Sequence, residues 1–311
     1  MSAVPQPGPR PPQPPSGPLR YRFGGLLLDS EIELPGFAHR RVDPGPDRPV
    51  RFRFRLVRTD APADADGPVV LGGAGRRLVV RRRPDGGYLL TGPDVAACAL
   101  LPDRRTLCWH PDRPATAADA EFLVGTVLPR LATVQDGLVL HAATLATPAG
   151  ALLLCGRSGA GKTTLSGAVA AEAGWPLLGD DAAALETDGE QVAVRGFNAD
   201  VRIRLSPEPG AAKRRAPAPE PAVGALPARL IVRLLPGRPT AVARPRPVER
   251  LIALRDNLLR LDRTDPDLRV RELACLAAVT GRVPVLDLHH PATGDAVAAT
   301  AARIADLAAV R

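Results

Sequence analysis

The chain has 311 residues, of which 45% are hydrophobic, enough for one large domain or two smaller ones. Only 3% are aromatic, so platforms for stacking bases are scarce, which counts against a reader of single-stranded nucleic acid. The net charge of +8 comes mainly from scattered arginines, with lysine only at Lys162 and Lys213. Because dispersed arginine more often marks a solvated exterior than a binding patch, we expect no nucleic-acid partner.

The four cysteines form no CxxC pair, and no histidine clusters with them as a zinc site would require. This pattern predicts reduced thiols in the cytoplasm. The amino terminus carries no apolar core like that of a signal peptide, and no run of about 18 apolar residues occurs. We therefore expect a soluble, cytoplasmic protein without a membrane partner.

The first half of the chain divides into a tail and a β-rich region. Residues 1–19 are proline-rich and predict a disordered tail, because they offer little that could be buried. Residues 20–114 consist of short segments separated by Pro, Gly and Asp, with period-two alternation clearest at Arg51–Val57. They predict a small, mostly-β N-terminal domain, and we place its end just before residue 115.

The second half reads as an α/β domain over residues 115–311. Its first segment, residues 115–133, has apolar residues at three- and four-residue spacing and predicts a helix interrupted near Pro129. Residues 207–227 are rich in Pro and Ala and predict a long mobile loop within this domain. Strands and helices otherwise alternate, with strands at 138–145, 151–155, 176–181, 228–235 and 283–288 and helices at 161–173, 249–261, 266–279 and 294–309.

A phosphate-binding loop is the most specific motif. Gly156, Gly161, Lys162 and Thr163 meet the spacing G-x-x-x-x-G-K-T, with an apolar strand before it and a helix after it. The glycines let backbone N–H groups turn toward phosphate oxygens, Lys162 reaches the β- and γ-phosphates, and Thr163 can bind Mg²⁺. The motif predicts a nucleoside triphosphate, held by Gly156, Ser158, Gly159, Ala160, Gly161, Lys162, Thr163 and Thr164.

Two adjacent carboxylates, Asp180 and Asp181, follow the apolar stretch PLLG. They would lie at the carboxyl end of a strand, where ligands of α/β sheets bind. One carboxylate can hold Mg²⁺ while the other accepts the proton of an attacking hydroxyl. Both reach the site only at a kink or strand end, because neighbouring strand side chains face opposite ways. The residues alone leave open which carboxylate has which role, and a solvated turn is the alternative.

The histidines and arginines near these motifs are less specific. His141, at the end of the apolar run GLVL, is either a core residue or a site residue at a strand end. His289 and His290 are adjacent and face opposite ways in a strand, so we predict surface residues. Three arginines after the Asp pair either clamp phosphate or an acidic substrate or belong to half-exposed strands, namely Arg195, Arg202 and Arg204.

Residues 137–186 resemble the catalytic core of the HPr kinase/phosphorylase family and its shorter relatives. In that family a histidine-containing strand, a phosphate loop and an Asp-Asp pair occur in this order and spacing. Residues 21–37 and 127–137 also fit the shorter relatives, so the rest of the chain is covered loosely. The resemblance implies an α/β P-loop kinase domain of the HPr kinase/PEP carboxykinase-like type, preceded by the mostly-β domain.

The same resemblance implies roles for individual residues. Lys162 and Thr163 would bind ATP and Mg²⁺, Asp180 would be the base that deprotonates a serine hydroxyl, Asp181 would assist at the metal, and His141 would orient Asp180. The bifunctional enzymes carry an acidic residue where this chain has Thr164, and a glutamate near the position of Ala193. We therefore expect a kinase for an acceptor other than HPr, and whether it also catalyses reverse phosphorolysis stays open.

We predict an ATP-dependent kinase that phosphorylates a hydroxyl, preferably serine, of a peptide, protein or small molecule. One alternative is an accessory or regulatory module that binds ATP without transferring phosphate. A transporter-type ATPase is weaker, because the LSG at 165–167 lies inside the helix after the loop and no separate signature loop occurs. The bifunctional relatives are hexamers, and whether this chain forms a homo-oligomer stays open.

Overall fold

The computed structural model describes residues 18–43, 50–59, 66–73, 77–109, 113–135, 137–187, 190–197, 200–204, 213–217 and 225–309, with backbone alone for 200–204 and 213–217. The predicted disordered tail lies outside these residues except for Pro18 and Leu19, and Leu19 begins the first strand. No helix in the described part of the chain is both long and apolar enough to cross a bilayer.

The N-terminal residues form an eight-stranded sheet in the order β1-β2-β3-β8-β7-β6-β5-β4. The pairs β2–β3 and β3–β8 are parallel and the other neighbours are antiparallel. In β3 the alternation appears as buried Phe52, Phe54 and Leu56 with arginines between them. The elements are β1 (Leu19–Phe23), β2 (Leu26–Ser30), η1 (Ala38–Arg40), β3 (Phe52–Arg58), β4 (Val69–Leu71), β5 (Val79–Arg82), β6 (Tyr88–Thr91), β7 (Cys98–Leu100) and β8 (Thr106–Trp109).

An interrupted helix covers this sheet. It runs through α1 (Ala117–Phe122), the π-helical turn η2 (Leu123–Val127), α2 (Leu128–Leu131) and the 3-10 turn η3 (Ala132–Gln135). Pro129 has no N–H to continue the α-helical pattern, and the N–H of Leu128 bonds to the carbonyl of Leu123 instead. The interruption predicted near Pro129 is therefore present as a π-helical turn.

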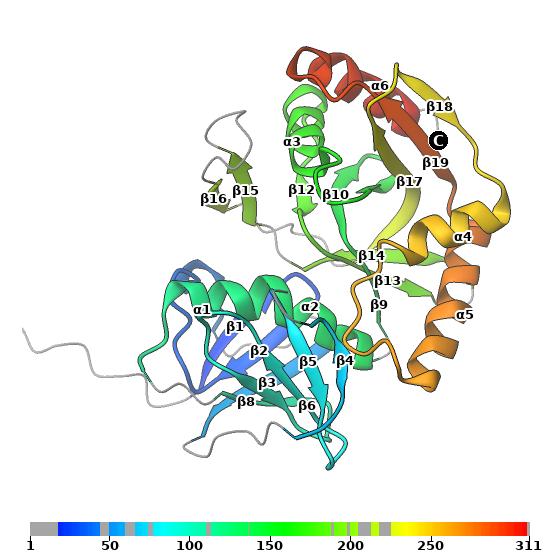
Figure 1. Cartoon of the computed structure of the whole chain (residues 1–311). Helices are drawn as coiled ribbons and strands as arrows, with labels where there is room; N and C mark the ends of the chain where they lie inside the picture. The colour runs from blue at the N-terminus through cyan, green and yellow to red at the C-terminus, as the bar shows by residue number, and fades with distance from the viewer. Residues whose placement is uncertain are drawn as a thin grey trace, which may run out of the picture.

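The interrupted helix packs on the N-terminal strands, although the sequence analysis groups it with the residues after 114. Leu123, Val127 and Leu131 share one hydrophobic core with Phe52 and Phe54. Figure 1 shows the helix lying between the N-terminal sheet and the C-terminal part of the chain. The helix thus lies at the junction between the two parts.

The C-terminal residues build a nine-stranded sheet with the order β12-β10-β11-β17-β14-β13-β9, in which β19 pairs with β17 and β18 pairs with β19. β11, β17 and β19 run parallel. Their carboxyl ends therefore lie at one edge. The strands are β9 (Leu138–Leu140), β10 (Ala142–Thr147), β11 (Gly150–Cys155), β12 (Leu177–Gly179), β13 (Ala183–Thr187), β14 (Val192–Gly196), β17 (Leu226–Pro236), β18 (Ala241–Ala243) and β19 (Val285–His290).

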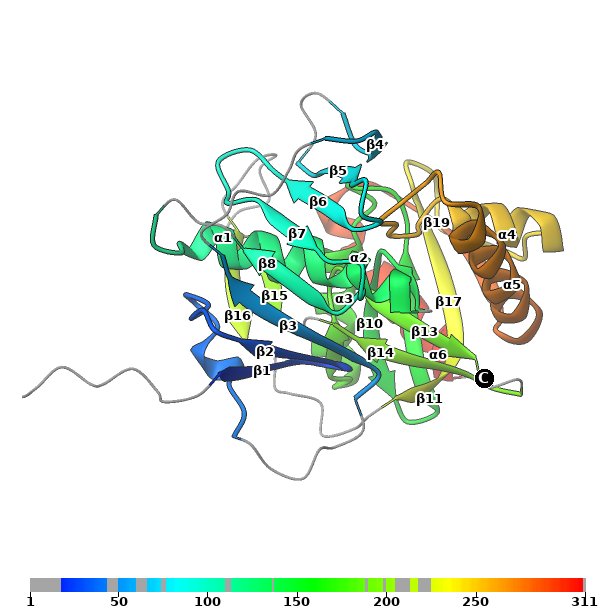
Figure 2. The same cartoon turned by 90° about the horizontal axis from the view of Figure 1, so that it is seen from below.

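Helices cover both faces of this sheet. Alternate residues of β11 separate the two cores: Leu152 and Leu154 pack with α3 (Lys162–Ala173) and α6 (Val297–Ala309). Leu153 and Cys155 pack with α4 (Pro247–Arg255) and α5 (Pro266–Arg282). Figures 1 and 2 show the two pairs of helices on opposite sides of the sheet, with the turn η4 (Gly294–Ala296) before α6. The predicted α/β character is confirmed.

The two parts meet along the end of β14. A Cβ atom placed on Gly24 would lie 1.7 Å from the carbonyl oxygen of Gly196, so the β1–β2 turn needs glycine there. The ring of Phe197 stacks on that of Phe52 with centroids 5.6 Å apart. The core is therefore continuous from the N-terminal sheet to the segment that follows the Asp pair.

The predicted mobile loop differs in part from the structure. Residues 213–217 form β16 (Lys213–Pro217), which pairs antiparallel with β15 (Asp200–Arg204), and β17 already begins at Leu226. Backbone pairing does not require apolar side chains, so the composition of this segment gave no sign of a strand. The remainder of the predicted loop, 207–212 and 218–224, lies outside the described residues.

Candidate phosphate-binding site

The loop between β11 and α3 has the backbone conformation that its glycines allow. Gly156 and Gly161 have positive φ values of 151° and 89°, and Gly161 caps the amino terminus of α3. The N–H of Ala160 bonds to the carbonyl of Arg157 at 3.0 Å and closes the turn. Ser158 and Gly159 are exposed at its crown, Ala160 is buried, and Thr164 is exposed on the first turn of α3.

Lys162 lies within this loop, with 7% of its surface exposed. Its ammonium donates hydrogen bonds to the carbonyl of Gly156 at 2.8 Å and to that of Arg157 at 3.3 Å. The cation is therefore held against the loop's own carbonyl oxygens. A phosphate group at the loop would compete with these carbonyls for the ammonium.

Asn257, after the end of α4, fixes the start of the loop. Its side-chain oxygen accepts a hydrogen bond from the N–H of Gly156 at 3.0 Å, and its amide donates to the carbonyl of Ala253 at 2.8 Å. Its backbone carbonyl accepts from the N–H of His141 at 2.7 Å. One residue thus joins the loop, α4 and His141. No motif or spacing marks it, because all of these partners are set by the tertiary fold.

The Asp pair lies where β12 ends, which meets the requirement for a strand end. Asp180 is 2% exposed, and its Oδ2 accepts a hydrogen bond from the hydroxyl of Thr163 at 3.2 Å. Asp181 is half-buried, and its backbone carbonyl accepts from Nδ1 of His141 at 2.9 Å. The structure therefore brings Thr163, the Asp pair and His141 together. His141 contacts the backbone of Asp181, whereas the resemblance implied that it orients the carboxylate of Asp180.

His141 occupies the break between β9 and β10, and its surroundings shift its pKa. Burial lowers its pKa, and the positive charges of Lys162 and Arg130 lower it further. The hydrogen bond to Asp181 and the charge of that residue act in the opposite direction but do not outweigh burial. The imidazole is therefore neutral at pH 7, with its hydrogen on Nδ1, because a carbonyl can only accept.

The oxygen atoms of Thr163 and Asp180 suit Mg²⁺. Both are hard ligands, and they lie 3.2 Å apart at the loop. Within the described ranges, no group of three or more His, Cys, Asp or Glu side chains could hold a metal ion by itself. Magnesium bound through one or two protein oxygens together with substrate phosphates fits this set of donors.

Of the three arginines predicted either as a clamp or as members of half-exposed strands, Arg195 alone has a described side chain. Nε of Arg195 donates to Glu186 at 2.8 Å, and the stem of Arg195 packs against Gly25, where an added Cβ would lie 2.5 Å from its Cδ. Arg195 therefore contributes to the contact between the two parts of the chain. The side chains of Arg202 and Arg204 lie outside the described structure, although the backbone of β15 lies beside α3.

The prediction that His290 is a surface residue is wrong. It is 6% exposed, and its Nδ1 donates to the carbonyl of Pro291 at 2.9 Å. A Cβ atom placed on Gly161 would lie 3.8 Å from the Cε1 of His290, so the ring lies close to the phosphate loop. The strand β19 is not at the edge of the sheet, because it pairs with β17 on one side and with β18 on the other. Neither arrangement can be read from two adjacent histidines.

Comparisons with known proteins add little to this geometry. No protein-family model and no curated protein matches the chain. Among solved structures, the Hpr(Ser) kinase/phosphatase from Coxiella burnetii aligns with 54% of this chain and 95% of its own, at 12% identity and a TM-score of 0.30. Because this TM-score is below 0.5, we draw nothing about fold or function from the similarity.

Proposed function

We propose that this protein transfers the γ-phosphoryl group of ATP to a hydroxyl, preferably serine, of a peptide, protein or small molecule. The observation that carries the proposal is the hydrogen bond from Thr163 to Asp180. It joins the hydroxyl of the phosphate loop to a carboxylate at a strand end, and the next residue, Asp181, is bound through its backbone carbonyl by His141. A phosphate cradle, metal ligands and a proton acceptor are the parts that phosphoryl transfer requires.

The phosphate side of the reaction rests on the loop and Lys162. Backbone N–H groups at the amino terminus of α3 would hold the β- and γ-phosphates. Lys162 would exchange its bonds to the carbonyls of Gly156 and Arg157 for phosphate oxygens. Little covalent chemistry is asked of the protein, because positioning and charge neutralisation supply most of the rate enhancement in phosphoryl transfer.

The contacts favour a division of labour between the two carboxylates that is the reverse of the one implied by the family resemblance. Asp180 touches Thr163, so we assign it with Thr163 to Mg²⁺, which when bound neutralises charge on the phosphate oxygens. Asp181 is more exposed than Asp180 and its charge acts on His141. We assign Asp181 as the base that takes the proton of the acceptor hydroxyl.

His141 is a positioning residue in this proposal. Its Nδ1 holds the backbone carbonyl of Asp181 at 2.9 Å, and its own N–H is fixed by Asn257. These bonds fix the backbone at the Asp pair where it leaves β12. A neutral imidazole serves this purpose, because a charged ring would add a second cation beside Lys162.

Two measurements separate the kinase from an ATP-binding module without transfer. The first is ATP binding by the wild type and by Lys162→Ala, which we expect to weaken binding by about tenfold or more, because it removes a charge-assisted contact. The second is transfer of labelled γ-phosphate to a panel of serine-containing peptides and hydroxy compounds. The ATP-binding module would be established instead by two results together. The wild type would bind ATP but label no acceptor, and Asp181→Asn would turn over ATP at the same rate as the wild type.

A further inference from the structure

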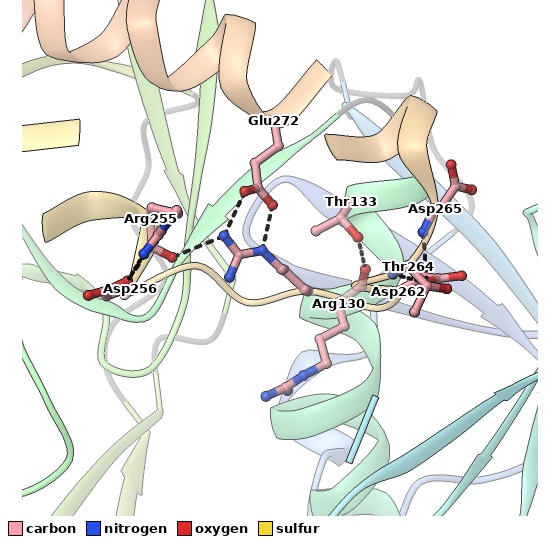
Figure 3. A network of polar contacts seen from close by, with 9 residues as sticks. Arg130, Thr133, Arg255, Asp256, Asp262, Thr264, Asp265 and Glu272 are labelled. Atoms are coloured by element: carbon pink, nitrogen blue, oxygen red, sulfur yellow. Dashed lines mark hydrogen bonds and ion pairs between the residues drawn. The ribbon is translucent and has the colours of Figure 1, made fainter. Parts of the chain in front are cut away.

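Arg130 on α2 is a cation without a matching carboxylate. Its Nη1 donates to the carbonyl of Thr126 at 2.7 Å, while its buried Nε has no hydrogen-bond partner. Among the residues that the structure describes, no ion pair joins Arg130 to an acidic side chain. In Figure 3 the side chain extends away from the carboxylates of Asp262 and Asp265.

The acidic residues of this region are already bound to other groups. Asp262 accepts from Nε of Arg82 at 3.0 Å and from the N–H of Thr264 at 2.7 Å. Glu272 is held by both ends of the Arg260 guanidinium at 2.6 Å, and Asp256 pairs with Arg255. Figure 3 shows the contacts of Glu272 and Asp256 and the bond of Asp262 to Thr264, none of which involves the guanidinium of Arg130.

The surroundings make this uncompensated charge costly. Burial lowers the pKa of Arg130 to about 10, with a contribution from the positive charge of Arg263. The guanidinium nevertheless stays protonated at pH 7. A partly buried cation near a second cation loses free energy unless an anion lies between or beside them. The charge of Arg130 also acts on His141, so it lies within electrostatic reach of the Asp181 side of the site.

A purely structural role explains only part of this arrangement. Arg130 donates to the backbone carbonyl of Thr126, a residue of the π-helical turn, with one of its five N–H groups. A neutral amide side chain would satisfy the same carbonyl. Among the described residues, the remaining donors bond to no acceptor and no carboxylate pairs with the charge.

We propose that Arg130 binds an anionic group, carboxylate or phosphate, on the molecule that carries the acceptor hydroxyl. This inference rests on the proposed kinase function and narrows its substrate class to hydroxyl compounds with a negative charge. The planar guanidinium suits both anions, because it offers paired N–H groups to their oxygens. The interrupted helix of the N-terminal part would thereby help to select the acceptor.

Anion binding can be measured without knowing the acceptor. Sulfate and inorganic phosphate are titrated into the full-length protein by calorimetry. Two samples are used, Lys162→Ala and the wild type saturated with MgADP, because in both the phosphate loop does not contribute to the measured anion binding. Arg130→Gln keeps a donor for Thr126 and removes the charge, and we expect it to weaken anion binding by about tenfold or more. Arg130→Lys should fall between, because it keeps the charge and loses the planar fork.

The matched control is Arg255→Met, which removes an exposed arginine from the same region and should change anion affinity by less than about twofold. Circular dichroism establishes that each variant is folded, and if Arg130→Gln is not, Arg130→Lys carries the test. ATP affinity should stay within about twofold of wild type in Arg130→Gln. The proposal would be overturned if Arg130→Gln and Arg130→Lys bound the anions as tightly as the wild type. It would also be overturned if Lys162→Ala abolished anion binding.

A second arm links the anion to the acceptor. Phosphate transfer is compared for pairs that differ in charge, such as glycerol 3-phosphate against glycerol and a hydroxy acid against its amide. We expect the charged member to be preferred by the wild type and the preference to be lost in Arg130→Gln. A neutral member preferred by the wild type contradicts the inference. If anion binding depends on Arg130 but the protein has no transferase activity, the result supports the anion site and counts against the kinase function. Failure of the anion site and failure of the kinase function are therefore distinguishable.

Discussion

The side-chain oxygen of Asn257 accepts a hydrogen bond from the backbone N–H of Gly156 at 3.0 Å, across 101 positions of sequence. The interaction is buried, and the same side chain donates to the carbonyl of Ala253. The conformation at the start of the phosphate loop is therefore fixed by a residue that follows α4.

We expect Asn257→Ala to destabilise the fold by about 1–3 kcal/mol, because it leaves the buried N–H of Gly156 without an acceptor. ATP binding should weaken as well, since the loop loses its anchor. Asn257→Asp keeps the acceptor but replaces the donor to Ala253 by a negative charge beside the phosphate loop, so its ATP affinity should also fall below that of wild type. Urea unfolding and ATP titration measure both effects. Equal ATP affinity in Asn257→Ala and wild type would show that the anchor is not needed for nucleotide binding.

The lowered pKa of His141 makes stability depend on pH between about 5 and 7. An unfolded histidine has a pKa of about 6.5, whereas burial and nearby cations disfavour the charged form in the folded protein. Below pH 6.5 the unfolded chain therefore binds more protons than the folded one. Wild type should lose stability relative to His141→Gln as pH falls from 7 to 5. A difference that is constant over this range in urea unfolding would contradict the assignment.

Asp119 predicts a second pH effect at lower pH. Burial alone would raise its pKa, but hydrogen bonds from Arg113, Thr116 and the backbone of Ala96 lower it below the ordinary value. It also completes the capping box of α1 with Thr116. Asp119→Asn should cost about 1–3 kcal/mol at pH 7.

The unfolded pKa of an aspartate is about 3.9, so the stability from ionised Asp119 is present above that pH and is lost as pH falls toward the lower folded pKa. The gap between wild type and Asp119→Asn should shrink from pH 4 downward. Unfolding curves at pH 7, 4 and 3 test this trend. A gap that widens on acidification would mean that the carboxylate is not stabilised as an anion.

Local patterns in the sequence were sufficient for the elements whose partners lie nearby. The alternation at Arg51–Val57 corresponds to the buried and exposed sides of β3. The phosphate loop is flanked by the predicted strand and helix, β11 and α3. These features depend on side-chain periodicity and on glycines with special backbone angles, both of which are written in adjacent residues.

Features set by distant contacts could not be predicted in this way. The helix at 117–135 is amphipathic, but its sequence does not say which sheet it covers. Asn257 and His290 are placed at the loop only by the return of distant segments. Arg130 resembles every other arginine in a chain rich in them, and its lack of a carboxylate is visible only once its neighbours are known.

The most direct test of the proposed site measures γ-phosphoryl transfer from ATP, to an acceptor or to water, as a function of Mg²⁺ concentration in wild type, Asp180→Asn and Asp181→Asn. Asp180 contacts Thr163, the residue with which we assign it to Mg²⁺. Asp180→Asn should therefore raise the Mg²⁺ requirement by about tenfold or more. Asp181→Asn should leave ATP affinity and the Mg²⁺ requirement unchanged and lower the maximal rate by about 10²–10⁴-fold. Wild-type rates in both variants would contradict a phosphotransferase site built on this pair of carboxylates.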